Sequence, residues 1–104
     1  MRGISFSPIA QRDLESALIY IALILKSPRA SKGLRKSIMS RLEQASDLPE
    51  IGRIYEEVQL ETEPIRRLLV EKYWVVYTYT DTSLTVLRIF HTNQDIDEFS
   101  LENF

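Results

Sequence analysis

Two strand-like runs near the C-terminal end constrain the fold of this chain more than any other feature. Trp74–Thr80 (WVVYTYT) and Leu84–Phe90 (LTVLRIF) are both rich in β-branched and aromatic residues. Only Asp81–Ser83 separate them, three polar residues of the kind that form tight turns. Runs joined this closely predict an antiparallel hairpin. Ile65–Glu71, a further strand candidate just upstream, extends the hairpin to a three-stranded meander.

Two Ser-Pro pairs, Ser7-Pro8 and Ser27-Pro28, predict the starts of two helices, because the hydroxyl can cap free amides and proline fits the first helical position. The first helix should end near Lys26, and the second at Asp47-Leu48-Pro49. So short a connection favours an antiparallel helical hairpin. The predicted inward faces are Leu14, Leu18, Ile21 and Leu25 in the first helix, and Leu34, Ile38, Leu42 and Ala45 in the second.

The N-terminal Gly3–Ser7 alternates apolar and polar residues, which predicts one more strand. The chain of 104 residues is therefore expected to form one α+β domain over residues 1–104. Its two layers are the helical hairpin and a four-stranded sheet, in which the first strand lies beside a strand of the meander. The other sheet face should stay open. Glu50–Pro64 is irregular and is typical of a functional or mobile loop.

The composition excludes several kinds of site. There is no cysteine and only one histidine, so neither a disulfide framework nor a metal-ligand pattern is present, and no cofactor is expected. The three glycines are too far apart for a phosphate-binding loop. The longest apolar run, Ala17–Leu25, is far shorter than the about 20 residues of a membrane span. We therefore expect a cytoplasmic protein without a membrane partner.

Charge is strongly segregated along a chain whose net charge is only −2. A stretch without any acid holds Lys26, Arg29, Lys32, Arg35, Lys36 and Arg41; acids dominate from Glu43 onward. Most of these cations lie off the inward face of the second helix. Such a basic helix fits either a charged partner or an ordinary solvated surface.

The residues with reactive or phosphate-binding chemistry are His91, Arg88, Arg66 and Arg67. RNA cleavage without a metal needs a base, a cation at the phosphate and an acid, and these side chains could supply them. Structural roles are the alternative. A histidine at a strand end is often a hydrogen-bonded structural group, and Arg88 could pair with Asp95 or Glu71. Since Arg66 and Arg67 alternate across a strand, one should face the open side and the other should pair with an acid.

The order of these elements, together with short motifs, resembles the RelE/ParE toxins of type II toxin–antitoxin systems, also called plasmid stabilisation systems. The motifs are Leu48-Pro49 followed by Gly52-Arg53, paired arginines before a VVY-type strand, and the closing LRIFHTNQDI. That closing segment is most similar to the ParE branch, in which a histidine ends a strand and an aspartate follows; here these are His91 and Asp95.

The resemblance implies different targets in its two branches. RelE-type members cleave mRNA on the ribosome, whereas ParE-type members poison DNA gyrase and are not known as nucleases. Trp74 and the apolar Leu68–Val70 stand where nuclease members often carry cations, so the ParE branch is favoured over an RNA-cleaving enzyme. An inactive module that only binds an antitoxin is a third hypothesis.

In either branch a cognate antitoxin is the expected partner, in a hetero-oligomer, and a toxin homodimer is the alternative. The apolar first helix of the toxin should bind an amphipathic segment. The predicted partner-binding residues are Leu18, Ile21, Leu25, Arg66, Arg88, His91 and Asp95.

Overall fold

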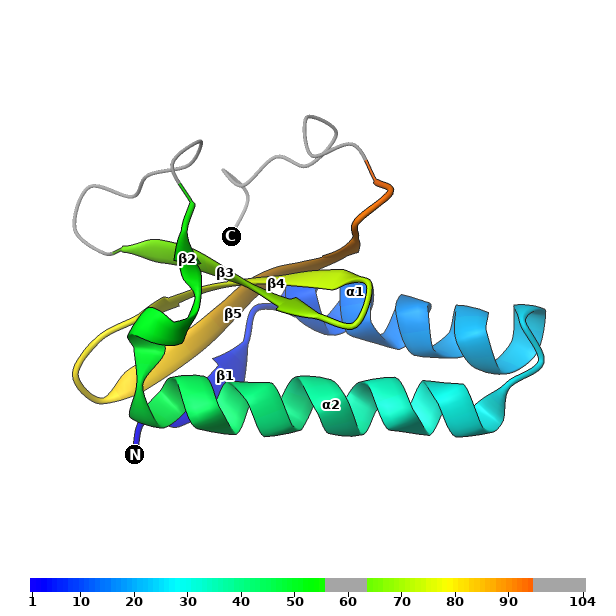
Figure 1. Cartoon of the computed structure of the whole chain (residues 1–104), viewed down its shortest axis with the longest axis horizontal. Helices are drawn as coiled ribbons and strands as arrows, with labels where there is room; N and C mark the ends of the chain where they lie inside the picture. Colours follow the sequence, from blue (N-terminus) through cyan, green and yellow to red (C-terminus); the bar gives the residue numbers. More distant parts are fainter. Residues whose placement is uncertain (56–63, 95–104) are drawn as a thin grey trace.

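A five-stranded sheet carries two long helices against one face in the computed structural model of the chain (Figure 1). The structure describes residues 1–55 and 64–94, so residues 56–63 of the predicted loop Glu50–Pro64 lie outside it. In chain order the elements are β1 (Gly3–Phe6), α1 (Pro8–Ile19), the π-helix η1 (Tyr20–Ile24), α2 (Pro28–Asp47), the 3₁₀-helix η2 (Pro49–Ile51), β2 (Arg53–Ile54), β3 (Ile65–Val70), β4 (Tyr73–Tyr79) and β5 (Ser83–His91).

The strand order is β1-β5-β4-β3-β2, with β1 parallel to β5 and all other neighbours antiparallel. This confirms the α+β class, the meander and the pairing of the first strand with a later one. The predicted count of four strands is wrong, because β2 adds a fifth at the edge of β3. A strand of two residues is too short to show an alternating pattern, so sequence periodicity could not reveal it.

Both helix starts lie where the Ser-Pro pairs predict them. The Ser7 hydroxyl accepts a hydrogen bond from the Ala10 amide at 3.0 Å, and the Ser27 hydroxyl accepts one from Ala30 at 3.2 Å. The first helix differs from its prediction in its last turn, which widens into the π-helix η1 before Lys26 enters the left-handed region at a φ of 54°. No helix in the described part of the chain is long and apolar enough to cross a membrane.

A β-bulge in β5 distributes its apolar side chains between the two sheet faces. One step along β4, from Val76 to Tyr77, corresponds to two steps along β5, from Arg88 to Val86, so Leu87 is the extra residue. Val86 and Ile89 consequently both pack in the cluster beneath the helices, whereas Leu87 joins a second cluster.

The sheet face away from the helices is not the open surface that the sequence suggests. Its cluster contains Tyr55, Val76, Leu87 and Phe90, each at most 6% exposed. Strand alternation explains the arrangement, since neighbouring residues of β4 contribute to opposite clusters. The domain therefore has apolar cores on both sides of its sheet.

A buried tyrosine holds the chain between α2 and β2 against the sheet. The Tyr77 hydroxyl donates a hydrogen bond to the Pro49 carbonyl at 2.5 Å and accepts one from the Gly52 amide at 3.0 Å. Burial raises the pKa of Tyr77 above its usual 10.0, so the hydroxyl keeps the proton that it donates. A Cβ atom on Gly52 would overlap the Tyr77 hydroxyl, which explains why glycine stands in the Leu-Pro…Gly-Arg motif.

Replacing Gly52 with alanine should therefore lower the free energy of unfolding by about 2–4 kcal/mol, since the ring must move and a buried hydrogen-bonded group loses its partner. Urea denaturation measures this. Gly33→Ala is the matched control: a Cβ atom added there would meet no atom within 4 Å, and it should stabilise α2 by roughly 0.5–1 kcal/mol. Equal effects at the two glycines would contradict the steric explanation.

Candidate functional site

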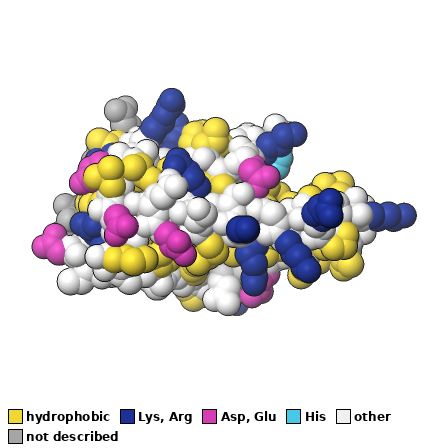
Figure 2. Space-filling view, turned by 60° about the horizontal axis from the view of Figure 1, so that its bottom comes forward, with side chains coloured by type: hydrophobic (Ala, Val, Ile, Leu, Met, Phe, Trp, Pro, Cys, Tyr) yellow, Lys and Arg dark blue, Asp and Glu magenta, His cyan; other side chains and the backbone are white. Residues whose placement is uncertain are grey.

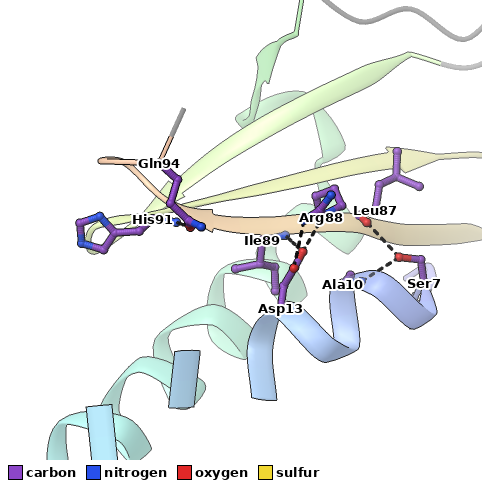
Figure 3. A network of polar contacts seen from close by, with 8 residues as sticks. All are labelled: Ser7, Ala10, Asp13, Leu87, Arg88, Ile89, His91 and Gln94. Atoms are coloured by element: carbon purple, nitrogen blue, oxygen red, sulfur yellow. Dashed lines mark hydrogen bonds and ion pairs between the residues drawn. The ribbon is translucent and has the colours of Figure 1, made fainter. Parts of the chain in front are cut away.

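Helix α1 and its N-terminal cap form hydrogen bonds with the part of the β5 edge that has no neighbouring strand. Strand β1 pairs only with Ser83–Val86, so the edge of β5 beyond Val86 has no strand partner on that side. The Ser7 amide donates to the Val86 carbonyl at 2.8 Å, and the Ser7 hydroxyl donates to the Leu87 carbonyl at 2.9 Å. Asp13 then accepts from the Ile89 amide at 3.0 Å (Figure 3). Groups of the helix and its cap thus satisfy backbone groups that a strand would normally satisfy.

Arg88 is held by the same aspartate. Its Nε lies 2.8 Å and its Nη2 3.2 Å from the two carboxylate oxygens of Asp13, a bidentate pair in which both side chains are largely buried. Of the two predicted partners, Glu71 forms no ion pair with Arg88 in the described part of the chain, where Asp13 is the acid observed. Asp95 lies outside the described residues. Asp13 was missed as a partner because nothing in the strand pattern shows that α1 runs along this edge.

His91 ends β5 in a tight polar corner. Its Nδ1 accepts a hydrogen bond from the Asn93 amide at 3.0 Å, and its own amide donates to Oε1 of Gln94 at 2.6 Å. The ring stands edge-on to Tyr73, with 5.2 Å between the ring centres. In Figure 3 it points away from Asp13 and Arg88. Of its two ring nitrogens, Nδ1 thus serves the turn, and Nε2 is the one with which His91 could meet a partner.

A groove separates this corner from α1 and η1. Its volume is about 630 Å³, and its walls include Asp13, Ser16 and Tyr20 on the helical side and Tyr73 and His91 on the sheet side. Burial, then the nearby Tyr20 phenol and the Glu71 carboxylate, raise the pKa of Tyr73 above 10.0. The Tyr73 hydroxyl is therefore a neutral donor and acceptor near pH 7. Neutral hydrogen-bonding groups of this kind suit a peptide or side chain better than a phosphate.

The two neighbouring arginines of β3 have different surroundings. Arg66 donates to the Gly52 carbonyl at 2.8 Å and to the Tyr79 hydroxyl at 3.4 Å. Arg67 lies over the rings of Trp74 and Tyr55, with 4.4 and 5.2 Å from its Cζ to the ring centres. Neither forms an ion pair within the described residues, so the expected pairing of one with an acid is not seen there. Both arginines are held by the fold.

Apolar side chains are exposed at the tip of the helical hairpin, which extends beyond the sheet (Figure 1). We define this apolar tip as Ile19 (57% exposed), Tyr20 (51%), Leu23 (69%), Ile24 (65%) and Leu25 (56%). Among the predicted partner-binding residues, only Leu25 belongs to it, because Leu18 and Ile21 are half-buried against the core. The other four were visible in the sequence as apolar residues off the predicted inward face.

The π-helix explains why Leu25 is exposed together with the other four residues of the tip. The Leu25 amide bonds to the Tyr20 carbonyl, five residues back, at 3.1 Å. Such a widened turn inserts one residue into the helical repeat and rotates the next residues by about 100°. Leu25 therefore leaves the line of Leu14, Leu18 and Ile21 and points outward.

The order of helices and strands and the Leu-Pro…Gly-Arg motif are similar to those of small toxins of toxin–antitoxin systems. Comparison with known proteins identifies the family to which the chain belongs. The profile of the ParE toxins of type II toxin–antitoxin systems, parDE, matches residues 4–96. The chain belongs to this family, and a ParDE system implies an antitoxin as partner. Among solved structures, a chain of the chromosomal ParDE system from P. aeruginosa has a TM-score of 0.64 at 17% identity, covering 88% of this chain and 96% of that one. No curated protein matches.

The Asp13 contacts can be tested by Asp13→Asn, which removes the carboxylate charge beside the Arg88 guanidinium. We expect a loss of about 2–4 kcal/mol in the free energy of unfolding, slightly below the usual cost of breaking a fully buried pair, because the Asp13 side chain is 16% exposed. Chemical denaturation measures it. Glu15→Gln, the same chemical change at an exposed position of α1, should alter stability by less than about 0.5 kcal/mol. Equal losses in both variants would contradict the assigned role.

Proposed function

We propose that this ParE-type toxin arrests growth by binding DNA gyrase in the cytoplasm, and that its antitoxin neutralises it by covering the same surface. The apolar tip carries the proposal. Monomeric proteins rarely expose large contiguous apolar patches without a binding function. Five large side chains at the protruding end of a hairpin form such a patch, and the exposed Lys26 follows it directly along the chain. An apolar centre with a charged rim is the usual composition of a protein–protein interface.

The positions of the nuclease candidates support gyrase over mRNA as target. Cleavage of RNA needs its base, acid and phosphate-binding cation to converge on one bond. Here Arg88 is engaged by Asp13, Arg66 by Gly52 and Tyr79, and Arg67 by two aromatic rings. Each guanidinium thereby contacts other groups of the same chain. His91, the fourth candidate, uses its Nδ1 in the turn, which leaves Nε2 as the ring nitrogen that could meet a ligand.

Purified chain should inhibit DNA supercoiling by gyrase, and the variant Leu23→Asp/Ile24→Asp should need at least tenfold more protein for the same inhibition, because two charges disrupt the apolar tip. Leu69→Asp, an apolar-to-acid change at a residue 48% exposed on β3, is the control and should inhibit as the unmodified chain does.

The ribonuclease alternative gives the opposite pattern. If the chain cleaves mRNA on translating ribosomes, leaves supercoiling unaffected, and loses growth arrest on His91→Ala, the gyrase proposal is wrong. Under our proposal His91→Ala retains growth arrest, since the ring serves a turn and a groove wall and no chemical step.

Without antitoxin the chain should self-associate through the apolar tip. Gel filtration over a range of concentrations should show apparent mass rising with concentration, because association hides exposed apolar surface. The same Leu23→Asp/Ile24→Asp variant should elute as a monomer throughout, whereas Leu69→Asp should behave like the unmodified chain. A native chain that stays monomeric at all concentrations would show that the apolar tip alone does not drive association.

A further inference from the structure

One side of α2 presents a straight row of cations to solvent. We define the basic ridge as Arg29, Lys32, Gly33, Lys36 and Ser40, all exposed. The spacing of 29, 33, 36 and 40 aligns them along the helix, opposite the buried Leu34 and Ile38. None of its three cations forms an ion pair with the described part of the chain. Figure 2 shows Lys and Arg side chains following the helix toward the hairpin tip, while most acidic side chains lie toward the other end.

The stability of α2 does not account for this arrangement. Cations are unfavourable near a helix N-terminus, yet α2 has Arg29 and no acid in its first turn. Gly33 lowers helix stability too, and it has neither a positive φ nor an atom close enough to require glycine. Two independent features of one helix face thus act against folding, and each would be explained by close approach of a polyanion.

From these observations we infer that the basic ridge binds the phosphate backbone of double-stranded DNA. None of the five ridge residues is large and apolar, and the exposed Leu69 shares a pocket only with the Lys36–Ser40 end, whereas a protein interface needs an apolar centre. Phosphate contacts need cations, hydroxyls and close backbone approach, which Arg29, Lys32, Lys36, Ser40 and Gly33 supply. From residue 29 to 40 the ridge is about 16 Å long, enough to span successive phosphates of one strand.

The acidic character of the whole chain does not prevent such binding. Two acids lie near one end of the ridge. Glu71 lines a pocket together with Lys36 and Ser40, and Glu43, the nearest acid along α2, is about 10 Å from Lys36 and about 21 Å from Arg29 along the helix axis. At roughly 0.1 M salt the screening length is about 10 Å, so the cations toward the hairpin tip act as a locally positive surface. The inference goes beyond gyrase binding, since it concerns DNA contact by this chain itself.

Fluorescence anisotropy with a short labelled DNA duplex tests it without gyrase. Binding by three cations should give a slope of log Kd against log salt of about 2.7 between about 50 and 200 mM salt. Lys32→Gln/Lys36→Gln should lower that slope to about 0.9 and weaken binding at least tenfold at low salt. Arg12→Gln/Lys72→Gln removes the same charge at exposed positions off the ridge and should leave at least half of the affinity.

Two results would overturn the inference. One is equal weakening by both double variants, which would mean attraction by overall charge and no specific surface. The other is absence of duplex binding, including the case in which a polyglutamate peptide binds the ridge instead and so identifies an acidic protein segment as the occupant. Since no gyrase is present, neither result bears on the supercoiling experiment.

Discussion

The arrangement of helices and sheet depends on the contacts that the Asp13 carboxylate of α1 makes with strand β5. Strand β5 has nine residues and β1 only four, so the second half of β5 would present an unpaired edge. Asp13 binds the Ile89 amide and the Arg88 guanidinium there. It blocks addition of another strand at this edge, which is a known risk of exposed strands. It also fixes α1 alongside β5, so that the helix continues past the sheet and its last turns protrude.

Most of the fold could be predicted from local sequence patterns, since local chemistry determines where these elements start and stop. The Ser-Pro caps at Ser7 and Ser27 and the polar turn at Asp81–Ser83 are where they were expected. The family resemblance rested on the same order of elements and is confirmed by the match over residues 4–96.

The parts that could not be predicted all depend on contacts distant in sequence or on irregular backbone. The π-helix moved Leu25 out of the predicted inward face, and the bulge at Leu87 changed which residues of β5 face the helices. The Arg88–Asp13 pair joins residues 75 positions apart. A periodic pattern carries no information on a single inserted residue, although one insertion changes the side to which every later side chain points. Sequence reasoning therefore named Arg88 and His91 as candidates but did not identify Asp13 as a partner of Arg88.

The protruding end of the hairpin combines two kinds of surface. Leu23 and Ile24 expose apolar groups on the α1 side, while Arg29 and Lys32 expose charge on the α2 side. The Ser31 hydroxyl, bonded to the Leu18 carbonyl at 2.8 Å, ties the two helices together just behind them. Because the two surfaces share one end of the helical hairpin, a partner that presents protein and DNA side by side can contact both at once. A topoisomerase bound to its DNA is a partner of that kind, so the apolar and cationic surfaces need not compete for it.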